Sequence, residues 1–407
     1  MNPHDKRILR DLAWHVAEAA AQPEMEQRRQ EWYRHNALQP GKPLIFCSPE
    51  GAWVELLPDT VLQCQEEEAR GWEWGLRMRL YAWEHFADDE VLDDEMSVGV
   101  CLVNTGWGLD PEYERTAERG ASRWEGRLQD AADLEKLTPP TTQVDEAATE
   151  RRLAEVHEVF DGILHVTRRN VHWWGISLIG EYARLRGLEQ ILLDMAMQPE
   201  FAHETMSLLQ AGRLAWLDSL ESQDLLALNN GNDYVGSGGF GFTCELPSQG
   251  FDPEHVRTRD LWGFAENQEG GTISPRMFEE FVLRYQLPIL ERFGLNCYAC
   301  CEPVHDRLDV ILQIPRLRRL SISPWTDREI AAEKLGDRVI YSWKPNPARL
   351  AGVGFDEDLV RREIRETIQI TQGCRLEIVL KDTHTCQGQP ERFDRWVRIA
   401  REEVDRV

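Results

Sequence analysis

The stretch FGLNCYACCEPVHDRLDVILQIPRLRRLSISPWTDREIAAEKLGDRVIYSW (residues 293–343) decides the fold. It contains three short apolar runs, Leu295–Cys300, Leu317–Ile322 and Val339–Trp343, and polar segments with helical spacing of apolar residues separate them. Short buried strands that alternate with amphipathic helices are typical of parallel β/α units. We therefore predict an α/β protein built on a parallel sheet.

The same alternation continues on both sides of this stretch. Further strands are predicted at Val171–Leu178, Leu225–Leu228, Leu261–Ala265 and Arg375–Leu380. Helices are predicted at Leu188–Met197, Pro199–Leu220, Pro275–Phe293, Glu302–Ile314, Asp327–Leu335, Glu357–Gln372 and Pro390–Val404. One N-terminal strand in LIFCSPEGAWVELLP (44–58) brings the predicted strands to eight, the number in a closed (β/α)8 TIM barrel.

The N-terminal part of the chain has a different pattern. Residues 1–40 have the apolar spacing of two helices, and residues 108–150 are polar and acidic. The segment Leu137–Thr142 resembles a connector. We predict an N-terminal, mostly helical extension with short strands over residues 1–150, followed by the barrel over residues 151–407.

The charge balance limits the partners of the protein. The 407 residues include 46 Lys and Arg against 71 Asp and Glu, a formal net charge of −25. Because nucleic-acid binding needs a basic surface, we expect no nucleic-acid partner. No stretch is long and apolar enough for a membrane span, and charges near the start do not fit a signal peptide. We expect a cytoplasmic protein, and its nine cysteines predict free thiols rather than a disulfide framework.

Polar and reactive residues follow the predicted strands. The active sites of (β/α)8 barrels lie where the strands end, so these residues are candidates for the site. They are Asn229, Asn230, Asp233, Glu266, Cys300, Cys301, Glu302, Trp325, Lys344, Lys381, Asp382, His384 and Cys386. The residues that enter the strands, such as Gly294 and Arg318, show no similar enrichment.

Two kinds of chemistry are compatible with these residues. Cys301, His384 and Cys386, with Cys300 or Glu302 as a fourth group, are residue types that bind zinc. The alternative is that the cysteines pack as small apolar residues and His384 bonds a loop carbonyl.

Asp233, Glu266, Glu302, Lys344 and Lys381 are candidates for general acid, general base or substrate anchor, and ion pairs between loops are the alternative. We predict substrate contacts from Asn229, Asn230, Tyr298, Trp325 and His172, although core packing is an alternative for the segment 172–174. The run GSGGFG (236–241) lacks the Lys-Ser/Thr ending of a P-loop, and we expect a flexible loop at the active site there.

Several segments resemble the superfamily of uroporphyrinogen decarboxylases and cobalamin-dependent methyltransferases. They are LEQILLDMAMQPEFAHETMSLL (188–209), NNGNDY (229–234), FGLNCYACCEPVHDRLDVI (293–311), SPWTD (323–327) and LKDTHTCQGQPERFDRW (380–396). The Cys-Cys-Glu-Pro sequence at 300–303 is most similar to the decarboxylase-like branch. The resemblance implies a (β/α)8 barrel and covers the chain from about residue 150 onward.

The resemblance favours methyl transfer over porphyrinogen decarboxylation. True decarboxylases have an N-terminal arginine-rich motif for substrate carboxylates, and residues 44–58 contain no basic residue. Thiol-methylating members bind zinc through a His-x-Cys and a later Cys. Here Tyr298-Ala299-Cys300 stands at the first position, without the histidine, and Cys386 matches the later cysteine approximately.

We therefore expect a methyltransferase that moves a methyl group between a small methylated substrate and a corrinoid protein or thiol acceptor. Zinc would assist this reaction, and a partner protein would carry the cobalamin. The alternatives are a decarboxylase or lyase acting on a small carboxylate, and a non-catalytic barrel that binds a tetrapyrrole or another small ligand. The sequence leaves the oligomeric state open, with a homodimer as one candidate.

Overall fold

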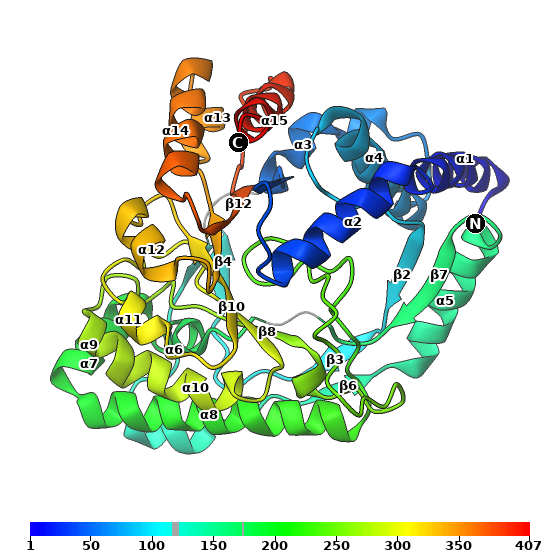
Figure 1. Cartoon of the computed structure of the whole chain (residues 1–407). Helices are drawn as coiled ribbons and strands as arrows, with labels where there is room; N and C mark the ends of the chain where they lie inside the picture. Colours follow the sequence, from blue (N-terminus) through cyan, green and yellow to red (C-terminus); the bar gives the residue numbers. More distant parts are fainter. Residues whose placement is uncertain (116–121, 173–174) are drawn as a thin grey trace.

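The computed structural model describes residues 1–115, 122–172 and 175–407, and it is an α/β protein with a parallel sheet. The main sheet has six parallel strands in the order β1-β12-β11-β10-β9-β8 (Figure 1). Their bounds are β1 Leu44–Cys47, β12 Arg375–Leu380, β11 Ile340–Trp343, β10 Leu317–Ile322, β9 Leu295–Tyr298 and β8 Trp262–Ala265. The predicted α/β class with a parallel sheet is confirmed, and so are the strands predicted after residue 260.

A second parallel pair, β2 (Glu95–Gly99) with β7 (His165–Arg169), lies beside this sheet. Single parallel bridges join Val171 to Leu226 and Ile176 to Ala265, so the chain between the two sheets is linked at isolated points. Closure into an eight-stranded barrel stays a prediction. Among the described residues, the strand predicted at Val171–Leu178 forms only single bridges at Val171 and Ile176, and the one predicted at Leu225–Leu228 forms only a bridge at Leu226. The prediction of a regular strand is wrong for the described parts of both segments, and residues 173 and 174 lie outside them.

Capping explains why the first of those predicted strands ends early. The hydroxyl of Ser177 accepts a hydrogen bond from the amide of Gly180 at 3.1 Å, which begins α6 (Leu178–Arg186) one residue later. A similar correction applies to the helix predicted at Glu302–Ile314. Only α11 (Leu308–Ile311) is helical there, since the carboxylate of Glu302 bonds backbone amides outside that segment.

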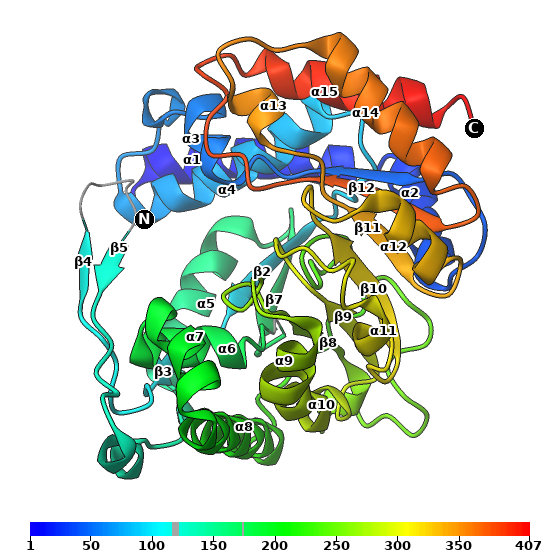
Figure 2. The ribbon, with the colours of Figure 1, turned by 90° about the vertical axis from the view of Figure 1, so that its left-hand side faces the viewer.

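Helices cover the outer side of the main sheet. Figures 1 and 2 show α8 to α12 outside strands β8 to β11, and α14 and α15 beside the N-terminal helices. The C-terminal helices of this layer are α7 Leu188–Met197, α8 Pro199–Ser222, α9 Pro275–Phe278, α10 Arg284–Leu290, α12 Arg328–Leu335, α13 Ala348–Ala351, α14 Glu357–Ile370 and α15 Glu391–Val404. A π-helical turn at Glu279–Leu283 separates α9 from α10.

The two helices predicted in residues 1–40 form as α1 (Pro3–Ala20) and α2 (Pro23–Asn36). The N-terminal part also contains α3 (Trp53–Leu56) and α4 (Glu67–His85), and α5 (Glu146–Phe160) packs against α1. Two antiparallel pairs follow β2: β3 (Leu102–Asn104) with β6 (Thr142–Val144), and β4 (Tyr113–Arg115) with β5 (Ser122–Trp124). The domain boundary at residue 150 stays a prediction, although β1, which precedes it, lies inside the main sheet.

A glycine-rich hairpin fills the inner side of the main sheet. Tyr234 and Phe240 form its antiparallel bridge, and its residues 235–242 are buried. A Cβ on Gly239 would lie 2.8 Å from Cζ of Arg319 in β10, and one on Gly238 would lie 2.7 Å from Cγ1 of Val379 in β12. The expectation of a flexible loop at 236–241 is therefore wrong, because these glycines let the backbone pack directly against the strands.

We expect Gly239→Ala to lower the free energy of unfolding by about 1–3 kcal/mol, since it adds a methyl group in a tight contact at a φ of 98°. Gly354→Ala is the matched control, because a Cβ there meets nothing within 4 Å, and we expect a change of at most about 0.5 kcal/mol. Urea unfolding of both variants measures the difference. Equal midpoints would show that the hairpin does not pack as described.

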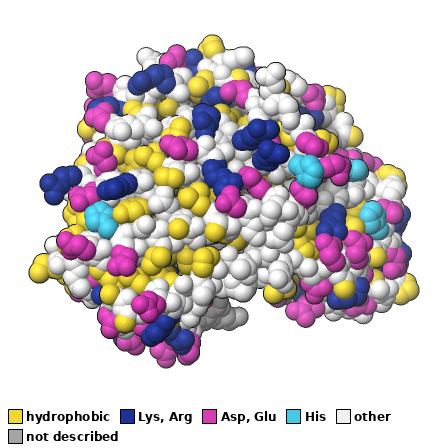
Figure 3. All heavy atoms as spheres, turned by 90° about the horizontal axis from the view of Figure 1, so that it is seen from below, with side chains coloured by type: hydrophobic (Ala, Val, Ile, Leu, Met, Phe, Trp, Pro, Cys, Tyr) yellow, Lys and Arg dark blue, Asp and Glu magenta, His cyan; other side chains and the backbone are white. Residues whose placement is uncertain are grey.

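In the part of the chain that the structure describes, no helix has the length and apolar character of a membrane span. Figure 3 shows basic and acidic side chains close together on the face seen from below, with hydrophobic side chains between them. The excess negative charge is thus not gathered into a single patch on that face.

Candidate functional site

A cluster of polar side chains lies where β9 and β12 end. We name Ser237, Cys300, Cys301, Lys381 and Asp382 the thiol cluster. The hydroxyl of Ser237 lies 3.4 Å from Sγ of Cys300, and the two cysteine sulfurs lie 3.5 Å apart. Sγ of Cys301 donates to Asp382 at 3.4 Å, and Nζ of Lys381 donates to the Ser237 hydroxyl at 3.2 Å. Strand ends and the glycine-rich hairpin therefore bring these groups together.

The backbone at this cluster is bent at three non-glycine residues. Glu50 follows β1, Ala299 follows β9 and Asp382 follows β12, and their φ angles are 48°, 67° and 58°. Left-handed conformations cost non-glycine residues about 1–3 kcal/mol and gather at functional sites. Glu50 accepts a hydrogen bond from the Asp382 amide at 3.1 Å and lies 3.8 Å from Nζ of Lys381. The three bends thus direct the side chains next to them toward the thiol cluster.

The two thiols differ in their tendency to ionise. The hydrogen bond from Cys301 lowers the pKa of Cys300 to about 6, with further help from the charge of Lys381 and from Ser237, although burial opposes it. The same contact raises the pKa of Cys301, and burial adds to this effect. The contact between the two sulfurs therefore favours ionisation of Cys300 over ionisation of Cys301.

A carboxylate links the thiol cluster to the next strand. Glu302 is 3% exposed, and its two oxygens accept hydrogen bonds from the amides of Asn267 and Cys300, both at 2.8 Å. Asn267 follows β8 and Cys300 follows β9, so Glu302 ties the ends of two adjacent strands. Its predicted catalytic role stays a prediction, and the contacts assign it the positioning of these two turns.

Glu266, at the end of β8, lines a pocket of about 320 Å³. Burial raises the pKa of this carboxyl to about 8, and the nearby charges of Glu302 and Glu269 add to the shift. The pocket is also lined by Tyr113 and Trp124 of the β4–β5 pair, and by Ser177, Glu181, Arg184 and Glu269. A carboxyl with this pKa keeps its proton at neutral pH and is able to act as a general acid.

Beneath the thiol cluster, the inner face of the sheet carries a buried ionic network. Nε of Arg319 lies 2.9 Å from a carboxylate oxygen of Glu377, and Nε2 of His35 lies 3.2 Å from the other oxygen. Glu377 also accepts a hydrogen bond from Ser342, whose hydroxyl accepts one from Lys344 at 2.5 Å. Burial lowers the pKa of Lys344 to about 7. Lys344 is 4% exposed and belongs to this inner network.

Two of the predicted substrate contacts, Tyr298 and Asn229, point elsewhere. Tyr298 is 1% exposed and its hydroxyl donates to Gln286 of α10 at 2.8 Å, because alternate residues of β9 face opposite sides. Asn229 is buried, and its side chain forms hydrogen bonds with backbone atoms of His172 and Trp262. These bonds link neighbouring segments where Leu225–Leu228 contributes only one backbone bridge. The assignments of Tyr298 and Asn229 are therefore wrong. Trp325 is 65% exposed, and its contact with a substrate stays a prediction.

Asn230 and Asp233 line a second pocket, of about 370 Å³, together with Asp93, Glu95 and Arg169. Asp233 forms an ion pair with Arg169, and burial raises its pKa although Arg169 and His172 oppose this. His172 bonds the Asn170 carbonyl at 3.0 Å. Asn230 and Asp233 therefore line a pocket that no residue of the thiol cluster lines. Trp173 and Trp174 lie outside the described residues.

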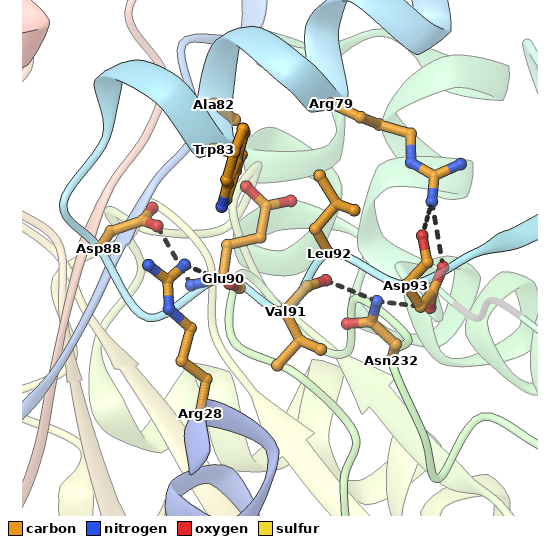
Figure 4. A pocket seen from close by; sticks show the side chains of 10 residues that line it. All are labelled: Arg28, Arg79, Ala82, Trp83, Asp88, Glu90, Val91, Leu92, Asp93 and Asn232. Carbon is orange, nitrogen blue, oxygen red and sulfur yellow. Dashed lines mark hydrogen bonds and ion pairs between the residues drawn. The ribbon is translucent and has the colours of Figure 1, made fainter. Parts of the chain in front are cut away.

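A smaller cavity of about 90 Å³ adjoins that pocket and shares Asp93 and Asn232 with it. Figure 4 shows Arg28 between Asp88 and Glu90, with Arg79 bonded to Asp93. Arg28 donates to the Glu90 carbonyl at 2.7 Å, and burial raises the pKa of both the Asp88 and the Glu90 carboxyl. The cavity is enclosed by groups that bond one another, which is typical of a structural ionic cluster.

The predicted zinc ligands do not assemble. Across residues 1–115, 122–172 and 175–407, no group of three or more His, Cys, Asp or Glu side chains is placed to hold a metal ion. Cys386 is fully buried, and its thiol donates to Glu55 at 3.1 Å rather than facing Cys301. His384 packs against Gly51, where a Cβ would lie 2.6 Å from its Nδ1. The donors present thus do not fit a zinc site.

Sequence reasoning did not single out Ser237, which belongs to the thiol cluster, or Glu50, which contacts it. It also missed the inner network of His35, Arg319 and Glu377. Glu50 stands directly after a predicted strand, in a Ser-Pro-Glu-Gly turn, and that position was a usable signal. Ser237 lies in the run 236–241, which the sequence predicted at the active site, but nothing in the run singled out this residue, because it reaches Cys300 only through the folding of the glycine-rich hairpin.

The comparisons with known proteins agree with the fold. No family model and no curated protein matches the chain. Among solved structures, a methyltransferase from Methanosarcina mazei is similar over 93% of this chain and 98% of its own, with a TM-score of 0.50 and 10% sequence identity. At this identity the likeness shows a shared fold. The chain is thus an α/β protein that shares its overall fold with this solved structure.

Proposed function

We propose that this protein is a methyltransferase that takes a methyl group from a small methylated substrate held in the Glu266 pocket. The observation that carries the proposal is Glu266 itself, a carboxyl that lines a pocket at a strand end and has a pKa raised to about 8. The likeness of the fold to a methyltransferase supports the choice of reaction.

The chemistry needs a proton donor at this position. When a methyl group leaves an ether oxygen, that atom keeps the bonding electron pair and is a better leaving group if it is protonated. Glu266 is placed to donate this proton, and Tyr113 and Trp124 offer aromatic surface to the substrate. Glu302 holds the turn that follows Glu266. A methoxylated substrate fits both the acid and the aromatic groups. A quaternary amine would fit the aromatic groups alone, because it leaves as a neutral amine without a proton.

The methyl acceptor belongs to the proposal as well. A corrinoid on a partner protein would supply the nucleophile that accepts the methyl group, and a thiol is the alternative acceptor. The open strand ends at the thiol cluster, where Cys300, Cys301 and Asp382 are partly exposed, are where such an acceptor would approach. No step here uses zinc, because the candidate ligands do not form a set. A closed (β/α)8 barrel would place the Glu266 pocket and the thiol cluster around the same opening, at the carboxyl ends of its strands.

A second candidate, a decarboxylase or lyase acting on a small carboxylate, is favoured by one observation. Lys381 is 8% exposed and donates to Ser237 at 3.2 Å, and its pKa is raised by the charges of Tyr234, Cys300 and Asp382 against the effect of burial. A fixed cation at the strand ends would anchor a carboxylate. A tetrapyrrole-binding barrel is not proposed, since the glycine-rich hairpin occupies the inner side of the sheet.

A product assay separates the two candidates. The purified protein is incubated with reduced cobalamin and, in separate reactions, with methoxylated aromatic compounds, quaternary amines and small carboxylates. We expect demethylated product, detected by mass spectrometry, from at least one methylated compound. Release of carbon dioxide from the carboxylates without any demethylation would favour the lyase and overturn the proposal.

A further inference from the structure

We propose that Cys300 and Cys301 are a reversible oxidation site, which a hydroperoxide converts to a disulfide between the two neighbouring residues. The inference goes beyond methyl transfer, and only its consequence for activity rests on the proposed function. Its basis is the geometry of the two sulfur atoms, which lie 3.5 Å apart at a partly exposed turn.

The turn is close to the shape that such a disulfide requires. An S–S bond of about 2.05 Å needs the sulfurs to approach by only about 1.5 Å. Adjacent Cα atoms lie about 3.8 Å apart, which is shorter than the usual span of about 4.4–6.8 Å across a disulfide. The bond would therefore be strained, and strained disulfides are the ones that thiols reduce easily. Reversibility follows from the same geometry that permits formation.

The position favours these two thiols over the other seven. Four of the others, Cys47, Cys64, Cys297 and Cys386, are buried, so a dissolved oxidant does not reach their sulfur atoms easily. Cys244 is exposed, and Cys101 and Cys374 are partly exposed, but none of the three has a second sulfur among the described contacts of its side chain. Cys300 has Ser237 at 3.4 Å and the ammonium of Lys381 nearby, and Cys301 offers the resolving sulfur. A reactive thiol beside a resolving thiol is the arrangement of redox-sensitive sites.

The reaction balances with a hydroperoxide as the oxidant. The sulfur of Cys300 attacks one peroxide oxygen and the O–O bond breaks, which gives a sulfenic acid on Cys300 and one water or alcohol. The sulfur of Cys301 then attacks the sulfenic sulfur, the S–O bond breaks, and a water leaves with the proton of the Cys301 thiol. Two thiols are oxidised, one peroxide is reduced, and an external dithiol restores both thiols by exchange.

The disulfide would change the site through one hydrogen bond. The amide of Cys300 donates to Glu302, whose other oxygen accepts from Asn267 directly after Glu266. The peptide group between Cys300 and Cys301 must turn to close the S–S bond, and its carbonyl accepts a hydrogen bond from Ser321 at 2.9 Å. This turn changes the backbone angles at Cys300, whose amide lies in the preceding peptide group, and so pulls on the link to Glu302. Glu266 would then lose part of the support that positions it, so oxidation is expected to lower the activity that depends on Glu266.

Mass spectrometry tests the proposal without any assay of activity. The whole protein is treated with hydrogen peroxide, alkylated and digested with trypsin, and the peptide 293–307 is analysed. We expect a loss of about 2 Da in this peptide, a link between Cys300 and Cys301 in its fragments, and full reversal by dithiothreitol. Oxygen additions on Cys300 in place of the link, or no change at all, would overturn the proposal.

Two variants sharpen this result. Cys301→Ser removes the resolving sulfur, so Cys300 is expected to gain about 16 or 32 Da as sulfenic or sulfinic acid. Cys244→Ser is the matched control for an exposed cysteine and should behave as wild type. A 2 Da loss that persists in Cys301→Ser would contradict the assignment. If the oxidised protein shows the link but no methyl donor is ever turned over, the proposed function fails while the oxidation site stands.

Discussion

Replacing Glu377 with leucine is expected to lower the free energy of unfolding by about 3–5 kcal/mol, the largest effect on stability that the structure indicates. Glu377 is fully buried and lies 2.9 Å from Arg319 and 3.2 Å from His35. Removing it leaves the guanidinium of Arg319, which is 1% exposed, without its carboxylate in a site that water does not reach. A buried charge that has lost its partner keeps its full desolvation cost.

The measurement is urea unfolding of the variant beside two others. Glu158→Gln breaks the exposed ion pair with Lys6 and is expected to cost at most about 1 kcal/mol. The double variant Arg319→Met with Glu377→Leu removes both charges, and we expect it to be more stable than Glu377→Leu alone. If Glu377→Leu unfolds at the same urea concentration as Glu158→Gln, the inner network does not hold the sheet together.

The same network predicts the effect of acid. Burial opposes ionisation of Glu377, but Arg319, His35 and Lys344 outweigh it and lower its pKa from 4.5 to about 2. A carboxyl whose pKa is lower in the folded state stabilises the protein above its unfolded pKa, and this contribution disappears as the pH falls through the folded value. The stability that Glu377 provides is therefore lost between about pH 4.5 and pH 2.

Replacing Glu266 with glutamine is expected to lower the rate of methyl transfer by about 10²- to 10⁴-fold, because the amide cannot donate the proton that the leaving atom needs. The wild-type rate should fall as the pH rises through about 8, since Glu266 then loses its proton. Glu266→Gln should lose this falling limb of the profile along with most of the rate. Steady-state kinetics from pH 6 to pH 10, with the substrate found by the product assay, measure both effects.

Glu269 provides a matched control for this experiment. It lines the same pocket, and its charge contributes to the raised pKa of Glu266. In Glu269→Gln we expect catalysis to continue while the falling limb moves to lower pH, because a neighbouring negative charge is gone. An unchanged rate in Glu266→Gln, or an equal loss in both variants, would rule out Glu266 as the proton donor.

The local pattern of the sequence was sufficient for much of the architecture. The apolar runs at Leu317–Ile322 and Arg375–Leu380 became β10 and β12 with the predicted bounds, because a short, fully buried strand between helices has few other ways to hide its side chains. The helices at Leu188–Met197 and Asp327–Leu335 formed for a similar reason, with Asp327 capping the second of them.

The candidate site was predicted less completely. Strand-end position alone pointed to Glu266, Cys300, Cys301 and Lys381, which the structure places at the pocket or in the thiol cluster. It also pointed to Tyr298 and Cys386, whose side chains turn away toward Gln286 and Glu55. A one-residue difference along a strand reverses the side that a residue faces, and the end of a strand is the part of it that sequence locates least well.

By itself, the sequence determined the alternation of strands and helices, the acidic character of the chain and the kinds of reactive group that follow the strands. These depend on the burial of nearby side chains along the chain. Only the tertiary structure decided that the glycine-rich hairpin packs against the inner side of the sheet, that Ser237 contacts Cys300, and that Glu377 pairs with His35 and Arg319. These contacts join residues up to 342 positions apart, and no local pattern encodes which distant partner completes a buried hydrogen bond.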